Sequence, residues 1–143
     1  MKIISHRGNV DGPNNKLENN PDHIQLLLDK QIDVEIDVWF YKDNYFLGHD
    51  EPIFKVEKAW LTQNLLWCHA KNIESMNKLL EDGMHCFWHE TDKITLTSNK
   101  IPWCYPNNWI KNGITVVLER QINIPKHIMG ICTDFINYYG KTI

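Results

Sequence analysis

The chain has 143 residues, of which 43% are hydrophobic and 23% charged, and its formal net charge is −3. The length is typical of one domain over residues 1–143, and the composition is that of an ordinary soluble protein. The sequence has no basic block, which argues against nucleic-acid binding. It has neither a secretory signal nor a run of roughly 18 apolar residues, so we expect a cytoplasmic protein without stable membrane insertion.

The first part of the chain predicts a strand, a polar loop and a helix. Residues 2–5 form an apolar, strand-like run. Residues 9–20 are rich in asparagine and contain a Gly-Pro pair, which excludes regular structure. Asn20 is suited to cap a helix over residues 21–31, because Pro21 fits the first helical position and apolar residues follow at helical spacing.

A hairpin-like stretch over residues 33–52 carries the strongest functional signal. Glu35 and Asp37 alternate with valines and an isoleucine in a β-type run. Both carboxylates therefore emerge from one face of the strand, while the apolar residues face helices on the other. A reversal at residues 42–44 returns the chain toward His49. Two acids on one face with a histidine nearby are what a divalent metal site with an acid/base group needs.

The remainder of the chain predicts one more helix and six more strands. The helix covers residues 73–82, with Asn72 as its N-cap and Gly83 as its stop. Residues 58–61 are suited to a single helical turn. Short apolar runs predict the strands at residues 65–68, 85–89, 94–97, 101–105, 114–118 and 128–132.

This series of eight main strands has the order of an α/β protein, in which functional groups gather at the C-terminal ends of strands. Eight strands indicate a (β/α)8 TIM-type barrel. That fold usually takes about 250 residues, however, and a parallel crossover needs about a dozen. The connections after residues 89 and 97 are far shorter. We therefore predict a compact or incomplete barrel with several helices reduced or missing, whose bare flank a homodimer partner could cover.

Cysteines and aromatic residues are expected mainly in the core. Free thiols are expected rather than disulfides or zinc ligands, because no cysteine belongs to a CxxC pair. Most tryptophans should fill the interior of a small barrel. Trp88, Trp103 or Tyr105 could instead form an apolar wall for the alcohol or lipid part of a substrate. Each of the four cysteines lies in or beside an apolar run: Cys68, Cys86, Cys104 and Cys132.

Four short motifs resemble those of the glycerophosphodiester phosphodiesterase family, part of the phosphatidylinositol-phospholipase-C-like superfamily. The family pattern reads HRG, then usually ENT, then ExD on the second strand and HD after a hairpin. The resemblance covers residues 3–50, with weaker similarities at Lys71 and at Thr133-Asp134. The matching motifs are His6-Arg7-Gly8, Glu18-Asn19-Asn20, Glu35-Ile36-Asp37-Val38 and Gly48-His49-Asp50.

The resemblance implies a metal-dependent phosphodiester hydrolase that acts on a glycerophosphodiester or a related phospholipid headgroup. His6 and His49 would be the catalytic acid and base, since imidazoles exchange protons near neutral pH. A neighbouring hydroxyl of the substrate would attack the phosphate and give a cyclic phosphate, which water could then open.

The resemblance also implies how the site is built. Glu35 and Asp37 would hold one divalent cation, most often magnesium or calcium in such enzymes. Arg7 would bind a phosphate oxygen through its planar donor fork, and Lys71 would help to hold the phosphate. Glu18 would support the site.

One position departs from the family pattern. The family usually has a third acid two residues before the strand-three lysine, and here His69 stands there, before Lys71. An imidazole makes the site less anionic and softer, which shifts the preference from calcium and magnesium toward manganese, zinc or iron. Glu119 or Glu90, each at the end of another strand, could instead supply the missing acid.

Simpler interpretations remain open at this point. The two acids of the second strand could form ion pairs with Arg7 and Lys71, because buried acids need either cations or a metal. The chain could also be a non-catalytic phosphate or metabolite binder that keeps a degenerate site. His89 ends a strand and could line the site. The other histidines are expected on the solvent face of the first helix or at strand starts: His23, His85 and His127.

Overall fold

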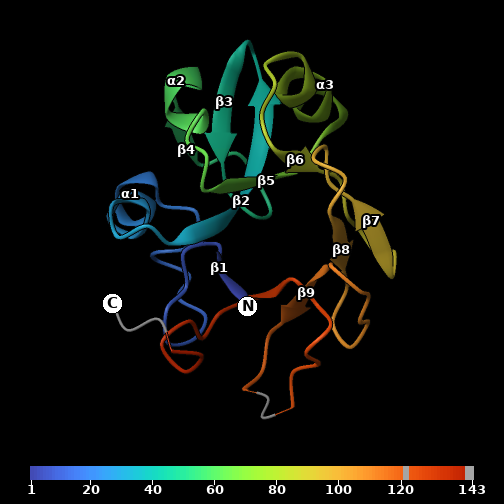
Figure 1. Cartoon of the computed structure of the whole chain (residues 1–143). Helices are drawn as coiled ribbons and strands as arrows, with labels where there is room; N and C mark the ends of the chain where they lie inside the picture. Colours follow the sequence, from blue (N-terminus) through green and yellow to red (C-terminus); the bar gives the residue numbers. More distant parts are fainter. Residues whose placement is uncertain (121–122, 141–143) are drawn as a thin grey trace.

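The computed structural model describes residues 1–120 and 123–140 as a mixed α/β fold with one ten-stranded sheet and three helices (Figure 1). The helices are α1 (Pro21–Asp29), α2 (Lys58–Leu61) and α3 (Ile73–Glu81). The strands are β1 (Lys2–His6), β2 (Asp33–Tyr41), β3 (Asn44–Leu47), β4 (Phe54–Val56), β5 (Leu66–Ala70), β6 (Cys86–Phe87), β7 (Ile94–Leu96), β8 (Pro102–Cys104), β9 (Ile114–Val117) and β10 (Gly130–Thr133). The α/β class expected from the sequence is confirmed.

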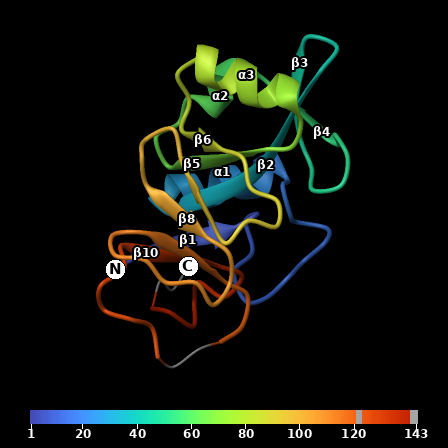
Figure 2. The same ribbon diagram turned by 90° about the vertical axis from the view of Figure 1, so that its right-hand side faces the viewer.

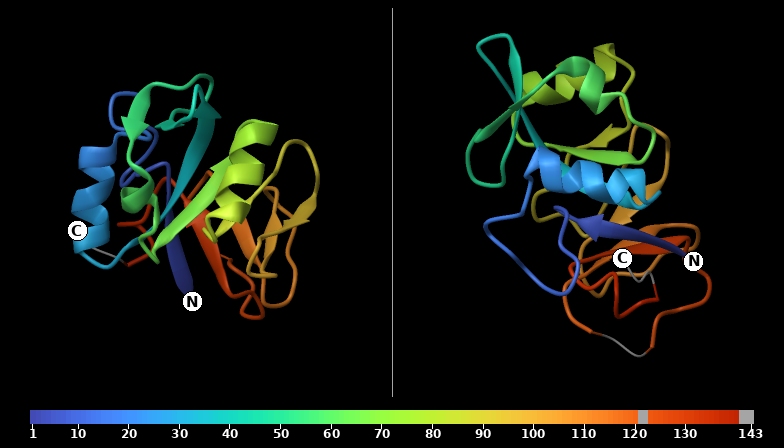
Figure 3. Two further views of the ribbon diagram at one scale, coloured as in Figure 1. Left: turned by 90° about the horizontal axis from the view of Figure 1, so that it is seen from above. Right: turned by 90° about the vertical axis from the view of Figure 1, so that its left-hand side faces the viewer.

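Seven strands run parallel, in the spatial order β6, β5, β2, β1, β10, β9, β8. The other three are antiparallel additions: β3 pairs with the second half of β2, β4 with β3, and β7 with β8. The view from above in Figure 3 shows β1 and β10 side by side near the middle of the sheet. Functional groups at the C-terminal ends of these parallel strands therefore share one edge of the sheet.

The sheet does not close into a barrel. In the described part of the chain, no β-ladder joins β6 to β8, and this open seam is bridged by other contacts. The Ser98 N–H donates to the Cys86 carbonyl oxygen at 2.7 Å, and the Phe87 and Trp103 rings stack with centroids 4.4 Å apart. The strands expected at 94–97 and 101–105 form an antiparallel hairpin instead of two successive barrel strands, because the link between them is too short for a parallel crossover.

The helices follow the capping signals of the sequence. The Asn20 side chain accepts from two backbone N–H groups at the start of α1, where Pro21 takes the first position. Asn72 and Ser75 form a capping box on α3, and Gly83 has φ +72° at its end. Figures 1 and 2 show that the three helices precede residue 82 in the chain and that the segments next to β8 and β10 are loops. The loss of helices in the second half is as expected from its short connections.

Some local predictions were wrong. The positive φ angles of the hairpin turn fall on Lys42 and Asp43, while Asn44 already belongs to β3. β4 was not expected, and β6 is much shorter than the run at residues 85–89. His23 does not face solvent freely, because its Nε2 lies 2.8 Å from the Gly8 carbonyl oxygen.

The sheet separates two clusters of apolar side chains. Val34, Ile36 and Val38 lie on the outer face of β2 with the residues that pack against α1 and α3, as alternation predicted. The inner face of the curved sheet is filled by one side chain from each of six parallel strands: Ile4, Trp67, Phe87, Trp103, Ile114 and Cys132. The β2 side chains on this inner side are acidic rather than apolar, and they include Glu35 and Asp37.

The four cysteines are free and buried, which confirms the expected thiols. Cys68 and Cys86 are neighbours across the β5–β6 ladder without forming a disulfide. Burial raises the pKa of the Cys132 thiol well above its usual value, so this side chain behaves as an inert apolar group.

Candidate active site

Strand register brings the candidate residues to one place. His6 of β1 lies opposite Glu35 of β2, and Asp37 of β2 lies opposite His69 of β5. Neighbours in register on parallel strands project to the same face, so these four side chains share the inner face near the C-terminal ends of their strands.

Glu35, Asp37 and His69 form a cluster whose ligand atoms all lie within 4.8 Å of one another. His69 Nδ1 is 3.2 Å from Asp37 Oδ1 and 3.6 Å from Glu35 Oε1. Its Nε2 lies 2.7 Å from the carbonyl oxygen of His89, which can only accept, so Nε2 carries a hydrogen. Nδ1 is then the nitrogen that faces the two carboxylates and could bind a metal in the neutral ring, the arrangement by which a backbone carbonyl orients a metal-binding histidine.

This donor set fits a divalent cation. Glu35 and Asp37 are almost fully buried, and Asp37 Oδ1 lies 3.2 Å from His69 Nδ1. Two carboxylates and an imidazole nitrogen this close together are a donor set that could hold such an ion. The two other candidates for the third acid lie outside the cluster. Glu90 and Glu119 are both exposed, and neither belongs to the group of possible metal ligands. The Tyr139 hydroxyl donates to the backbone carbonyl oxygen of Glu119.

Asp37 also forms the ion pairs that were the simpler alternative. Its Oδ2 lies 3.1 Å from Arg7 Nε and 3.3 Å from His49 Nδ1, and its Oδ1 lies 3.6 Å from Lys71 Nζ. Burial alone would raise the pKa of the Asp37 carboxyl. The hydrogen bonds from His49 and His69 and the charge of Arg7 outweigh burial and hold that pKa well below its usual range. Asp37 therefore stays ionised and gathers the cations of the site around it.

His6 is oriented by a carboxylate from the last strand. Its Nδ1 lies 2.8 Å from Asp134 Oδ1, so Nδ1 donates, and Nε2 points to the side of Glu35, whose Oε2 is 4.0 Å away. Burial would lower the pKa of His6, but the hydrogen bond to Asp134 and the charge of Glu35 raise it overall. Asp134 also accepts from Asn9 Nδ2 at 2.7 Å. The sequence had marked Asp134 only as a motif similarity, without assigning it a role.

His49 carries its hydrogen on Nδ1, as His6 does. Arg7 Nη2 lies 3.4 Å from His49 Nε2, and a guanidinium can only donate, so Nε2 accepts. Nδ1 then carries the hydrogen toward Asp37. With its side chain 40% exposed, His49 stands at the mouth of the site.

The loop after β1 holds the phosphate-binding candidate in place. Arg7 has φ +55°, and its N–H donates to the Glu35 carbonyl oxygen at 2.9 Å. Glu18 Oε2 lies 3.4 Å from Arg7 Nη1, and Glu18 Oε1 accepts from Asn9 at 2.9 Å. Asn19 is buried and exchanges two hydrogen bonds of 2.9 Å with Asp37. Glu18 is thus a neighbour of the site, and Asn19 is a support that sequence reasoning did not single out.

A cavity of about 380 Å³ opens beside these groups. Its lining combines polar residues with Trp103, Tyr105, Val116 and Leu118. Trp103 both fills the inner core and borders the cavity, whereas Trp88 packs against the outer core and forms no wall. The polar lining residues are His6, Arg7, Glu35, His49, His69, Lys71, His89 and Glu90.

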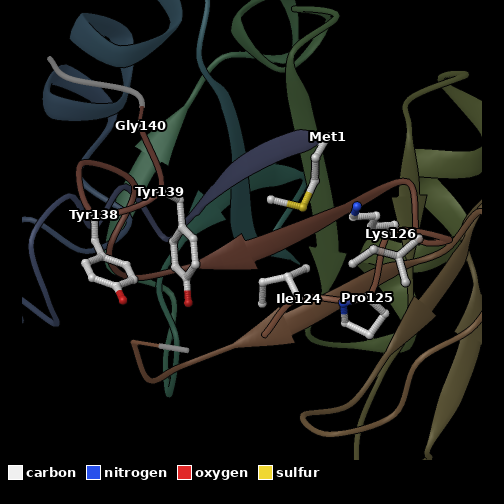
Figure 4. A pocket seen from close by; sticks show the side chains of 8 residues that line it. Met1, Ile124, Pro125, Lys126, Tyr138, Tyr139 and Gly140 are labelled. Carbon is white, nitrogen blue, oxygen red and sulfur yellow. The ribbon is translucent and has the colours of Figure 1, made fainter. Parts of the chain in front are cut away.

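A larger cavity of about 760 Å³ lies elsewhere (Figure 4). It is bordered by Met1 before β1, by Ile124, Pro125 and Lys126 before β10, and by residues near the end of the chain. These segments hold no group of acids and histidines that could bind a metal among the described residues. We therefore place the candidate site at the smaller cavity, which acidic and histidine side chains line.

The stability of the protein in chelator is expected to fall as the pH rises from about 6.5 to about 9. Burial would lower the pKa of His69, but hydrogen bonds to Asp37 and Glu35 raise it to about 9. The raised pKa stabilises the folded state fully below the unfolded pKa of about 6.5, and this contribution is lost as pH rises through about 9. Urea titrations should show a difference of roughly 2–3 kcal/mol relative to His69→Gln across this range. Equal pH dependence in both proteins would contradict the charge on His69.

Comparisons of the chain with protein-family models, with curated proteins and with solved structures gave no match. None of the helices in the described residues has the length and apolar character needed to cross a membrane.

Proposed function

We propose that this chain is a metal-dependent phosphodiester hydrolase acting on a glycerophosphodiester or a related phospholipid headgroup. The proposal depends above all on one juxtaposition. The cluster of Glu35, Asp37 and His69 lies against the same cavity as His6, which Asp134 orients, and His49. Phosphodiester cleavage needs charge neutralisation on the phosphate, a base and an acid, and a metal-binding group beside two separate imidazoles could supply all three.

The three residues of the cluster would hold one divalent ion, which when bound neutralises charge on the phosphate. Because imidazole replaces a carboxylate, manganese or zinc should suit the site better than magnesium or calcium. Arg7 and Lys71 border the same cavity and supply donors for the remaining phosphate oxygens.

The two histidines have distinct proton roles in this proposal. His49 Nε2 accepts a hydrogen bond and so suits the base, whereas the raised pKa of His6 suits the acid. His49 takes the proton of a substrate hydroxyl next to the phosphate, and that oxygen bonds to phosphorus. The bond from phosphorus to the leaving alcohol breaks, and His6 gives its proton to the departing oxygen. Water then opens the cyclic phosphate with the two roles exchanged.

The test is turnover of a glycerophosphodiester by the full chain, first in chelator and then with magnesium, calcium, manganese or zinc added. We expect product only with a metal, and the highest rate with manganese or zinc. A phosphomonoester with the same alcohol serves as the control for a contaminating phosphatase. Absence of turnover with all four metals would refute the enzyme proposal.

Replacing His69 by glutamate should move the metal preference toward magnesium and calcium. The ratio of affinities should change by about 10–100-fold, the range seen when the surroundings of a metal site are altered. The measurement is metal titration by calorimetry for wild type, His69→Glu and His69→Gln. Gln is the control, because it removes the imidazole without adding a charge and should weaken all metals. An unchanged metal order in His69→Glu would show that His69 is no ligand.

A non-catalytic phosphate or metabolite binder is the second candidate, and one observation favours it. Arg7 and Lys71 already pair with Asp37, so the acids have cationic partners within the protein itself. Metal-independent binding of a phosphodiester together with the absence of turnover would favour this function.

We also propose that the fold is a reduced relative of the (β/α)8 barrel, supported by seven parallel strands with candidate residues at their C-terminal ends. Four free thiols support a reducing, cytoplasmic location. Ile94 and Leu96 on the edge strand β7 are 44% and 61% exposed, which favours a homodimer through the bare flank. Sedimentation of wild type and a Leu96→Lys variant tests that contact.

A further inference from the structure

One histidine on the rim of the cavity has no part in the proposed reaction. His89 follows β6, and its carbonyl oxygen accepts from His69 Nε2. Its own ring borders the cavity, and both ring nitrogens are buried without a hydrogen-bond partner among the described residues. A buried polar atom without a partner costs about 1–3 kcal/mol, so the ring gains free energy by turning toward a molecule in the cavity that supplies partners.

The chemistry of the ring limits what that molecule is. Each ring nitrogen of an imidazole is a site for one hydrogen bond. A neutral imidazole offers one N–H donor and one nitrogen acceptor. A hydroxyl group can pair with either nitrogen, whereas a trimethylammonium group can pair with neither.

The neighbouring aromatic residues do not form a cage for a cation. Trp103 is only 2% exposed, and its ring is covered by Phe87 at 4.4 Å and Trp67 at 5.7 Å between centroids. That leaves Tyr105, whose ring centre lies 5.6 Å from that of His89. A single exposed ring beside an imidazole is a weak site for a quaternary ammonium group, which is usually enclosed by several aromatic faces.

We propose that His89 determines specificity for the leaving alcohol, and that this subsite takes an uncharged alcohol with several hydroxyl groups. The inference rests on the proposed function, because it assigns the part of the same cavity around His89 and Tyr105 to the alcohol half of the diester. Tyr105 and Leu118 would contact the carbon skeleton of the alcohol, while His89 would exchange hydrogen bonds with its hydroxyl groups.

The test compares two glycerophosphodiesters, one whose second alcohol is glycerol and one whose second alcohol carries a trimethylammonium group. Wild type should prefer the glycerol diester by about tenfold in kcat/KM, and His89→Phe should remove this preference. His89→Gln keeps a donor and an acceptor and should retain most of it. His127→Gln changes an exposed histidine that does not line the cavity, so it is the control and should leave the ratio unchanged.

Metal affinity separates this role from an indirect effect on His69. The His89 carbonyl remains in every variant, so the Kd for manganese should stay within about twofold in His89→Phe. A substrate ratio that is the same in wild type and His89→Phe, or a wild-type preference for the trimethylammonium diester, would overturn the proposal while leaving the hydrolase function intact.

If neither diester is hydrolysed with any metal, the hydrolase proposal fails and binding decides the subsite. Calorimetric affinities for the same two diesters would then be compared in wild type and His89→Phe. Loss of the glycerol preference in the variant would support the subsite, and affinities that do not respond to the variant, or no binding of either diester, would overturn it.

Discussion

Replacing His6 by glutamine is expected to lower kcat roughly 10²–10⁴-fold, the range for loss of a general acid or base. Glutamine still donates to Asp134, so the variant loses the exchangeable proton without leaving a buried carboxylate unpaired. His49→Gln should have an effect of similar size. The double variant should be only slightly worse than either single one, because acid and base act as a unit.

The exposed His127 provides the matched control for these variants, and His127→Gln should keep full activity. The measurement is steady-state turnover of a glycerophosphodiester with saturating metal, together with the unfolding free energy of each variant. Activity within threefold of wild type in both His6→Gln and His49→Gln would refute the acid/base assignment.

The second large effect is expected on stability. Asp37→Asn should destabilise the chelator-treated protein by about 3–5 kcal/mol, the penalty for removing one partner of a buried ion pair. Three positive groups surround this fully buried carboxylate: Arg7 Nε lies 3.1 Å, His69 Nδ1 3.2 Å and Lys71 Nζ 3.6 Å from its oxygens. In the variant they would lose their shared negative partner. The same variant should also lose its measurable affinity for manganese.

Asp50→Asn is the control for Asp37→Asn. Asp50 lies 3.7 Å from His49 Nε2, but its side chain is 93% exposed, so the change should stay within about 0.5 kcal/mol. Urea titrations in chelator measure both variants. If Asp37→Asn proved more stable than wild type, repulsion between Asp37 and Glu35 would dominate, and the buried cations would not be what balances this carboxylate.

Local structure followed from the sequence where short-range rules apply. The caps at Asn20 and Asn72 depend on side chain and backbone within a few residues, and both helices start where predicted. The alternation in β2 placed Glu35 and Asp37 on one face for the same reason. The limits of the short strands were less accurate, because two or three residues carry little periodicity.

Short-range sequence rules could not show whether the sheet closes into a barrel. Eight apolar runs suggested eight barrel strands, but pairing depends on the length of the links and on partners far along the chain. The short link between β7 and β8 turned two of the runs into a hairpin, and among the described residues β6 and β8 do not pair with each other. An apolar run indicates a strand, but it does not indicate which neighbour that strand pairs with.

The sequence by itself determined the residue types of the site and the strand ends that carry them. Only the tertiary structure decided between His69, Glu90 and Glu119 as the third member of the cluster, through the register that sets Asp37 beside His69. It also decided that Asp134, 128 residues from His6 along the chain, orients that ring. Side-chain periodicity is local and can be read from the sequence, whereas such contacts depend on register between distant strands.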